Sequence, residues 1–206
     1  MPKQIIFHID VNSAFLSWEA SYRIHHLGGT VDLRTIPSAV GGNISKRRGI
    51  VLAKSIPAKK YHIQTGEPIT DALRKCPNLI IVPPNYELYE KNSKAFMNIL
   101  RKYTDKVEQY SIDEAFMDMT GTQMLFGPPV VAATALKDEI RRTLGFTVNV
   151  GISDKKLLAK MASDFEKPDR VHTLFSEDIQ QKMWPLPVRD LFFVGSDYEK
   201  KLNAIG

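Results

Sequence analysis

Two adjacent acids stand between short apolar segments and are the first residues whose types suggest chemistry. Asp113 and Glu114 follow Val107, Tyr110 and Ile112 and precede a mostly apolar run, residues 115–119. Two short strands meeting at an acidic turn predict a hairpin, and at a turn both carboxylates can reach the same spot. Carboxylates in a mostly apolar sheet need a cation or lose their charge. The alternative is an ordinary solvent-exposed turn.

A third acid, Asp10, ends an apolar strand expected over residues 4–11. Asp10 lies far from Asp113 in the sequence, so only the fold can bring the two together. Carboxylates together with a backbone carbonyl form a hard oxygen site, which suits Mg²⁺. Mg²⁺ takes its remaining ligands from water and substrate phosphates, so the chemistry predicted is phosphoryl transfer assisted by two metal ions.

Composition places the chain among globular proteins of one or two domains, because 43% of its 206 residues are hydrophobic and 25% are charged. The net charge of +5 is compatible with a polyanionic partner. The single cysteine, Cys76, excludes an intramolecular disulfide framework and fits the cytoplasm. No apolar run approaches the roughly 18 residues of a membrane span. Because a strand begins almost at once, we expect no signal peptide.

The elements around Asp10 are expected to form a strand, a helix and a small inserted unit. Asn12 or Ser13 is predicted to cap a helix that runs to about residue 25. Residues 31–66 form the insertion, with short β segments at 33–40 and 49–53 around a glycine pair and three cations. A helical turn at 56–61, a helix at 68–75 and a strand at 78–82 follow. His8 is expected to be a packed strand residue, and Phe15 either a core residue or a wall beside the substrate.

The second half is predicted to surround the acidic hairpin with helices. We expect helices at 86–103 and 130–144 because their apolar residues recur at helical spacing. A strand at 147–152 and a helix at 155–165 are expected to follow. These elements indicate an α+β fold, ferredoxin-like in topology. After residue 174, helices at 186–191 and 197–204 flank a turn that contains Gly195. This arrangement resembles a helix–hairpin–helix, whose turn amides can hold a DNA phosphate.

Taken together, four motifs in the same order resemble the Y-family translesion DNA polymerases, and most of all their bacterial DNA polymerase IV branch. The similarity extends from Ile5 to Gly206. The motifs are Asp10-Val11-Asn12-Ser13-Ala14-Phe15; Tyr110-Ser111-Ile112-Asp113-Glu114-Ala115-Phe116; Val150-Gly151-Ile152-Ser153 with Leu158-Ala159-Lys160-Met161-Ala162-Ser163-Asp164; and Lys167-Pro168.

The resemblance implies an α+β polymerase right hand with a ferredoxin-like palm, a small fingers insertion and a partial helical thumb. The palm is expected at residues 1–12 and 80–173, the fingers at 13–79 and the partial thumb at 174–206. The family's little finger domain is not expected within this chain. The implied activity is template-directed DNA synthesis during damage bypass.

The same resemblance implies roles for individual residues. Asp10, Asp113 and Glu114 bind two Mg²⁺ ions, for which Mn²⁺ can substitute, together with the Val11 carbonyl. Phe15 excludes a 2′-hydroxyl, and the nucleotide contacts are Lys59 and Lys167. The DNA contacts are Arg47, Arg48, Lys155, Lys156 and Gly195. The implied partners are primer–template DNA and a deoxynucleoside triphosphate, and, for a full-length protein only, a sliding clamp.

Several residues depart from the family pattern. Ile56 replaces an aromatic residue and Lys59 an arginine, so the fingers lose a bidentate contact with phosphate. Ala53 lacks a common hydroxyl, while Asn12 and Ala14 replace an aspartate and an aromatic residue. These changes keep open a second interpretation, a DNA-binding or regulatory module that retains the fold with impaired catalysis. A nucleotide cyclase, a third interpretation, is disfavoured by the C-terminal hairpin-like element and Lys167-Pro168.

Overall fold

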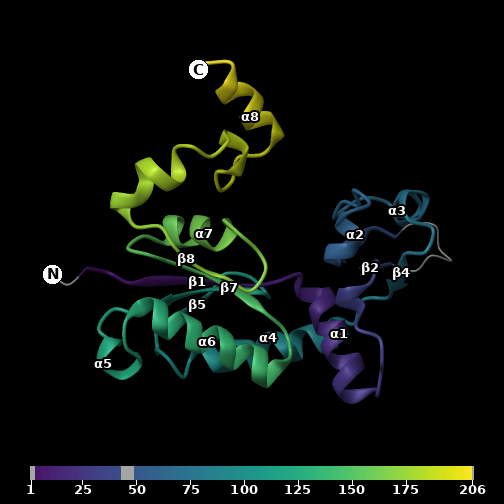
Figure 1. The fold of residues 1–206 in the computed structure, drawn as a ribbon, viewed down its shortest axis with the longest axis horizontal. Helices are drawn as coiled ribbons and strands as arrows, with labels where there is room; N and C mark the ends of the chain where they lie inside the picture. Colours follow the sequence, from purple (N-terminus) through teal and green to yellow (C-terminus); the bar gives the residue numbers. More distant parts are fainter. Residues whose placement is uncertain (1–2, 43–48, 206) are drawn as a thin grey trace. The chain divides into compact units, whose positions relative to one another are not determined.

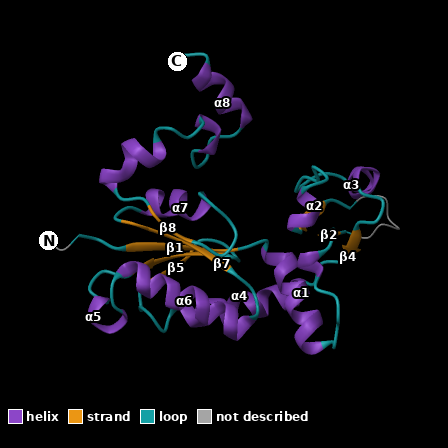
Figure 2. Ribbon diagram, viewed as in Figure 1, coloured by secondary structure: helices purple, strands orange, loops and turns teal. Residues whose placement is uncertain are grey.

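The computed structural model describes residues 3–42 and 49–205, and the chain divides into two compact units. The first unit comprises residues 1–10, 97–140 and 148–206, and the second comprises residues 11–96 and 141–147. Each unit contains its own β-sheet together with helices (Figure 2). The α+β class expected from the sequence is therefore confirmed. The division into palm, fingers and partial thumb stays a prediction.

The first unit is built on a five-stranded sheet in the order β5-β6-β1-β7-β8. Its strands are β1 (Ile6–Val11), β5 (Val107–Gln109), β6 (Glu114–Asp118), β7 (Val148–Ser153) and β8 (Val171–Thr173). The predicted acidic hairpin is present, because β5 and β6 pair antiparallel. β1 also pairs antiparallel with β6, in a register that places Asp10 opposite Glu114. The fold thus aligns two acids that are far apart in the sequence.

Helices cover both faces of this sheet, with α7 (Lys156–Asp164) on one face and α6 (Pro129–Leu144) on the other (Figure 1). Helix α7 approaches β7 so closely that a Cβ atom added to Gly151 would lie 2.0 Å from the Ala159 carbonyl oxygen. Only glycine permits this approach. Of the apolar stripe predicted for α6, Ala132, Leu136 and Ile140 are buried, whereas Leu144 at its end is half-buried. In chain order, helix α4 (Tyr86–Leu100) precedes β5, and the short helix α5 (Gln123–Phe126) lies between β6 and α6.

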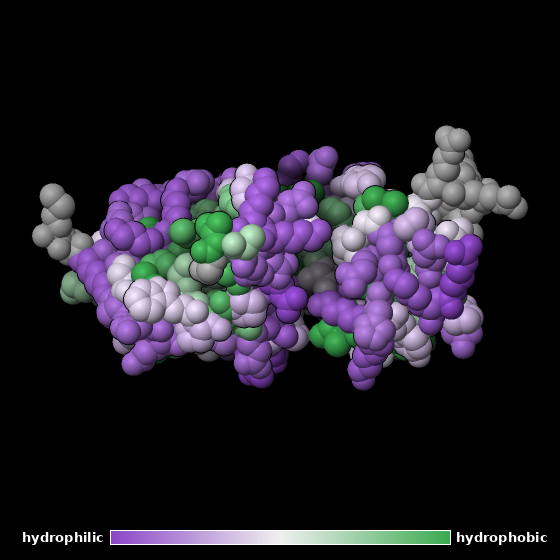
Figure 3. All heavy atoms as spheres, turned by 90° about the horizontal axis from the view of Figure 1, so that it is seen from above, coloured by the Kyte–Doolittle hydropathy of each residue, from purple (hydrophilic) through white to green (hydrophobic). Residues whose placement is uncertain are grey.

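The C-terminal segment packs against α7 and ends in helix α8 (Ser196–Asn203). Before α8 lie 3-10 turns at Ser176–Asp178 and Val188–Asp190 and a π-helical turn at Ile179–Met183. The expected helix at 186–191 is thus only a three-residue turn. It follows Pro187, which cannot donate a backbone hydrogen bond. Phe193 and Ile205 of this segment are 80% and 82% exposed. Apolar residues also reach the surface as patches on the largely hydrophilic face drawn in Figure 3.

The second unit contains a three-stranded sheet in the order β3-β2-β4. Strand β2 (Ser38–Gly41) pairs antiparallel with β3 (Val51–Lys54) and parallel with β4 (Ile80–Val82). The helices are α1 (Ala14–His26), α2 (Ile56–Lys59) and α3 (Ile69–Lys75). One apolar cluster joins the sheet to α2 and α3; its buried members are Ala39, Val51, Ala58, Ile63, Ile69, Ala72, Cys76 and Leu79.

Some boundaries differ from the predictions for physical reasons. The β segment expected over residues 33–40 begins only at Ser38, because Asp32 accepts a hydrogen bond from the Arg34 amide and caps a 3-10 turn at Leu33–Thr35. Ser13 occupies the N-cap of α1, yet its side chain makes no capping hydrogen bond because its backbone is left-handed, at a φ of 48°. Strand β8 was not predicted. Within residues 3–42 and 49–205, no helix is both long and apolar enough to cross a bilayer.

Candidate active site

Two of the predicted catalytic acids face each other across neighbouring strands of the first unit. Asp10 lies near the end of β1 and Glu114 opens β6, and their Cα atoms are paired in the β-ladder. Asp113 lies in the turn just before Glu114, where the Ser111 hydroxyl donates to its Oδ1 at 2.7 Å. The antiparallel register therefore brings these acids to one end of the sheet, as the sequence predicts.

Two lysines bind these acids from α7 and the loop that follows it. Lys160 Nζ lies 2.9 Å from Glu114 Oε2 and 3.3 Å from Asp10 Oδ2. Lys167 Nζ lies 2.9 Å from the same Asp10 oxygen. Asp164 contacts both lysines, at 3.4 Å from Lys160 and 2.8 Å from Lys167. The site is thus a network of alternating charges, in which the ammonium groups neutralise the paired carboxylates.

The electrostatics of the acids differ between neighbouring positions. The hydrogen bond from His8 lowers the pKa of Glu114 to about 2, with Lys160 adding to the effect against the cost of burial. Burial raises the pKa of Asp113, and the charges of Asp10 and Glu114 raise it further. Burial opposes the charge of Lys160, but the surrounding carboxylates raise its pKa above the usual range. Asp113 is therefore the acid of this site whose ionised form is disfavoured by burial and by the neighbouring carboxylates.

This donor set fits a divalent cation by its chemistry. The carboxylates of Asp10, Asp113 and Glu114 are hard oxygen donors. Burial raises the pKa of Asp113 and the negative charges of Asp10 and Glu114 raise it further, so a divalent cation would stabilise its ionised form. Among the described residues, however, no group of three or more His, Cys, Asp or Glu side chains is arranged as a formed metal site. Lys160 and Lys167 lie on the carboxylate oxygens that a cation needs. Cation binding thus requires that the carboxylates or the lysines reorient.

His8 is a functional candidate that the sequence analysis treated as a packed strand residue. It is fully buried, and its Nε2 lies 3.1 Å from Glu114 Oε2. Its Nδ1 lies 2.8 Å from the Ser163 hydroxyl oxygen of α7. The sequence analysis likewise gave no role to Lys160. A usable signal was the spacing of Lys160, Ser163 and Asp164, which places them on one face of a helix that follows a strand.

The second unit contains the two remaining nucleotide candidates, Phe15 and Lys59, and the metal candidate Val11. In the second unit, the ring of Phe15 stacks on Tyr89 with centroids 4.6 Å apart and lies 5.9 Å from Trp18. Val11, in the same unit, is 2% exposed. Lys59 ends α2 and is exposed. These positions are compatible with the predicted roles, which stay predictions.

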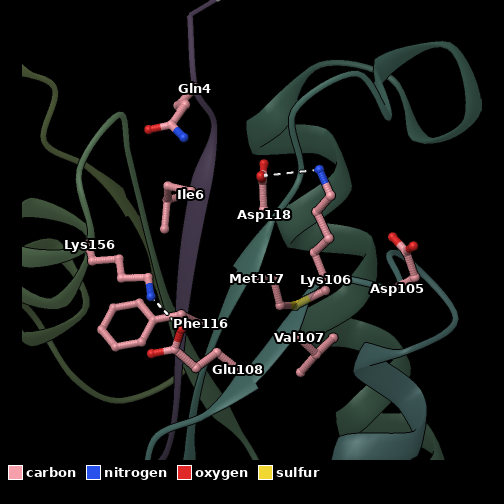
Figure 4. Close-up of a pocket in the computed structure, with 10 residues that line it drawn as sticks. All are labelled: Gln4, Ile6, Asp105, Lys106, Val107, Glu108, Phe116, Met117, Asp118 and Lys156. Atoms are coloured by element: carbon pink, nitrogen blue, oxygen red, sulfur yellow. Dashed lines mark hydrogen bonds and ion pairs between the residues drawn. The ribbon is translucent and has the colours of Figure 1, made fainter.

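The predicted DNA contacts are mostly exposed side chains. Lys156 lines a cleft of about 350 Å³ on the sheet (Figure 4). There it pairs with Glu108 and lies 5.6 Å from the centre of the Phe116 ring. Lys155, which precedes α7, and Gly195, which precedes α8, are also exposed. Arg47 and Arg48 lie outside the described residues.

Comparison with known proteins places the chain in a family. The sequence profile described as the impB/mucB/samB family matches residues 9–164. The chain is 50% identical over 202 residues to DNA polymerase IV of Clostridium acetobutylicum, covering 98% of this chain and 50% of that one. It is 39% identical over 203 residues to DNA polymerase IV 1 of Bacillus subtilis, covering 98% and 47%. The chain thus spans about half the length of these curated relatives.

Solved structures agree with this placement. DinB from Sulfolobus solfataricus has a TM-score of 0.86 and 29% identity to the chain, covering 98% of this chain and 57% of that one. A structure described as an insertion ternary complex of Dbh DNA polymerase has a TM-score of 0.84 at the same identity, covering 98% and 58%. The chain therefore belongs to the impB/mucB/samB family and has the fold of the Y-family DNA polymerases.

Proposed function

We propose that the chain is the catalytic part of a template-directed DNA polymerase of the translesion type. The single observation that carries this proposal is the pairing of Asp10 with Glu114 across β1 and β6, with Asp113 in the turn just before Glu114. Membership of the family and the likeness to DNA polymerase IV relatives support it. In this assignment, residues 1–12 and 80–173 are the palm, 13–79 the fingers and 174–206 a partial thumb.

The proposed reaction joins a deoxynucleotide to a primer. The primer 3′-oxygen attacks the α-phosphorus of the triphosphate, a new phosphodiester bond forms and pyrophosphate leaves. Asp10, Asp113, Glu114 and the Val11 carbonyl would hold two Mg²⁺ or Mn²⁺ ions. When bound, these ions activate the primer hydroxyl and neutralise the triphosphate.

The chain's own cations and Phe15 supply the remaining functions. Lys167, which is one-third exposed, can exchange Asp10 for a phosphate oxygen, while Lys59 offers a second ammonium group. We assign to Phe15 the exclusion of a 2′-hydroxyl. Arg47, Arg48, Lys155, Lys156 and Gly195 are assigned to backbone contacts with primer–template DNA, which position it without reading sequence. A sliding clamp as partner of a longer form, and a cytoplasmic location, belong to the same proposal.

A second candidate is a DNA-binding or regulatory module with the same fold and impaired catalysis. The observation that favours it is the composition of α2, where Ile56 is 49% exposed in place of an aromatic residue and Lys59 replaces an arginine. A lysine makes a point contact with phosphate rather than a bidentate one. This arrangement weakens the expected grip on a nucleotide and leaves the acids of the first unit unchanged.

Primer extension separates the two candidates. We would fuse the chain to the C-terminal half of the Clostridium acetobutylicum relative, supply primer–template DNA, Mg²⁺ and the four deoxynucleotides, and measure products. Template-dependent extension that disappears in Asp113→Ala supports the polymerase. The complete Clostridium acetobutylicum relative is the positive control for extension under the same conditions. If this relative extends the primer while the fusion binds DNA without extending it, the impaired module is supported.

A further inference from the structure

The surroundings of His8 place a buried imidazole directly behind a proposed metal ligand. His8 lies on β1 opposite Phe116, and it is 0% exposed. Its ring lies 4.7 Å from the Phe116 ring, measured between centroids. His8 and Asp10 are two residues apart on one strand, so their side chains emerge on the same face of the sheet. Glu114 lies on the corresponding face of the neighbouring strand, next to both residues.

The hydrogen bonds of the ring fix which nitrogen carries a proton. Glu114 Oε2 also contacts the ammonium group of Lys160 at 2.9 Å, so Glu114 is the carboxylate partner of an ion pair and only accepts hydrogen bonds. The Nε2 atom of His8, 3.1 Å from Glu114 Oε2, must therefore carry a hydrogen and donate it. The opposite nitrogen, Nδ1, lies 2.8 Å from the Ser163 hydroxyl.

The Ser163 hydroxyl has one proton and two neighbours. Its oxygen also lies 2.8 Å from the Lys160 carbonyl oxygen, which only accepts. If the hydroxyl donates to this carbonyl, Nδ1 must carry a proton as well; if the hydroxyl donates to Nδ1, the ring is neutral. In both arrangements Nε2 donates to Glu114. The direction of the His8–Glu114 bond therefore does not depend on the charge of the ring.

The second partner of Glu114 uses the same oxygen. Lys160 Nζ lies 2.9 Å from Oε2, the atom that accepts from His8. Neither contact uses Oε1. The two donors thus fix the rotation of the carboxylate through one oxygen. When a cation binds, Lys160 must either move away from the carboxylates or share their oxygens with the cation. His8 is enclosed between the sheet and α7 and stays in place.

The position of Ser163 depends on the close packing of α7 on β7. A Cβ atom at Gly151 would lie 2.5 Å from the Ser163 amide nitrogen, so glycine lets this turn of α7 reach the sheet. Asn149, two residues before Gly151 on β7, donates to the Ser163 carbonyl oxygen at 2.9 Å and fixes the same turn of α7 to the sheet. Ser163 is itself fully buried. The ring of His8 is thus supported by a rigid contact rather than by a mobile surface group.

We propose that His8, supported by Ser163, is a positioning residue that orients the Glu114 carboxylate for binding a divalent cation. The inference rests on the proposed function, in which Glu114 is a ligand of that cation. Outer partners that hydrogen-bond to ligating groups change metal affinity by roughly 10–100-fold when they are removed. A histidine that served only to fill the core would not affect cation affinity once the fold is preserved.

The test compares two substitutions of similar size in the 206-residue chain. His8→Gln keeps an N–H donor that can reach Glu114, whereas His8→Leu removes it. Mn²⁺ affinity is measured by electron paramagnetic resonance of the free ion, and folding by circular dichroism and thermal unfolding. We expect His8→Leu to bind Mn²⁺ about tenfold more weakly than the unchanged chain, and His8→Gln to recover most of the affinity. Equal affinities for the folded variants and the unchanged chain would overturn the proposal.

Two further measurements keep the outcomes distinguishable. If His8→Leu does not fold, Ser163→Ala takes its place, and an unchanged Mn²⁺ affinity in that variant overturns the proposal. Glu114→Gln tests the proposed function separately: if it leaves the Mn²⁺ affinity unchanged, Glu114 is not a ligand. If the unchanged chain itself binds no Mn²⁺, the role proposed for His8 in cation affinity is overturned. Nitrogen-15 NMR of the His8 ring should find a proton on Nε2. A ring protonated on Nδ1 alone would contradict the assignment of Nε2 as the donor, independently of the Mn²⁺ affinities.

Discussion

Lys160 Nζ lies 2.9 Å from Glu114 Oε2, so a proposed metal ligand is already paired with a cation of the protein itself. The side chain of Lys160 is 8% exposed, and this ion pair is therefore largely removed from water. The same ammonium group reaches Asp10 at 3.3 Å. This pairing explains how a buried cluster of acids remains stable before any divalent cation arrives, and it yields the first of five predictions.

Lys160→Met should destabilise the chain in the absence of divalent cations. The substitution leaves Asp10 and Glu114 facing each other without the buried ammonium, and removing one partner of a buried pair costs about 3 kcal/mol or more. Added Mg²⁺ should restore part of the loss, because it supplies the missing charge. Urea unfolding with and without Mg²⁺ measures both effects.

Lys91→Met is the matched control, because Lys91 pairs with Glu87 on the exposed surface of α4. Exposed helix pairs of this kind contribute little to stability, because water screens both charges. A loss in Lys160→Met no greater than in Lys91→Met would show that the cluster does not need Lys160.

Acid should destabilise the chain through Glu114. Its folded-state pKa of about 2 lies below the ordinary value of 4.5, so its contribution is present above pH 4.5 and is lost as the pH falls toward 2. The full contribution is at most about 3 kcal/mol. Asp113 acts in the opposite direction because its pKa is raised. We expect the free energy of unfolding to fall less between pH 6 and pH 3 in Glu114→Gln than in the unchanged chain. Equal losses would argue against this assignment.

Gly151→Ala should separate α7 from β7. The new methyl group would lie 2.0 Å from the Ala159 carbonyl oxygen, a backbone atom that cannot turn away. Overpacking of this kind typically costs 1–3 kcal/mol, so we expect a loss of about 2 kcal/mol or more in thermal or urea unfolding. Gly195→Ala is the control, since nothing lies within 4 Å of its added Cβ. Similar stability of both variants would contradict the close packing of α7.

Phe15→Ala tests whether Phe15 discriminates between sugars. In the extension-competent fusion, ribonucleotide incorporation relative to deoxyribonucleotide incorporation should rise roughly tenfold or more, the equivalent of about 1.4 kcal/mol. Phe15 stacks on Tyr89, so its removal also leaves a cavity that lowers stability. Tyr89→Phe keeps the stacked ring and should leave sugar selection unchanged. An equal fall in the use of both sugars would mean that Phe15 serves only the core.

The exposed lysines should determine how DNA binding responds to salt. Removing a lysine that binds one phosphate of duplex DNA makes the slope of log K against log salt concentration shallower by about 0.9. Lys155→Ala should show this change, whereas Lys156→Ala should show less, because Lys156 is already paired with Glu108. Fluorescence anisotropy at several salt concentrations measures the slopes, and Lys91→Ala serves as the control. Identical slopes for the three variants and the unchanged chain would move the DNA-binding surface elsewhere.

Much of the fold was predictable because its signals are local. The hairpin around Asp113 follows from apolar runs that meet at an acidic turn, and the helix at 130–144 follows from its apolar spacing; both are confirmed. The short 3-10 turn at Leu33–Thr35 was missed because a single side chain, Asp32, decides it. Strand β8 was missed because its three residues carry little pattern of their own and depend on pairing with β7.

The site was less predictable, since it depends on pairings between distant parts of the chain. The sequence indicated Asp10 and Glu114 as partners, but only the register of β1 against β6 places them opposite each other. Nothing in the strand pattern distinguishes His8 from a packed residue. Its role depends on Ser163, which reaches the ring only because Gly151 lets α7 approach the sheet.

The central place of β1 in the sheet also has a consequence for synthesis on the ribosome. β1 is made before its neighbours in the sheet, β6 and β7, which begin only at Glu114 and Val148. The second unit draws most of its residues from one continuous stretch, 11–96. This stretch can therefore begin to fold while β1 still lacks both partners. Until β6 emerges, both edges of the apolar strand β1 are unpaired, and one edge stays unpaired until β7 follows. Unpaired apolar edges are a hazard for aggregation during synthesis.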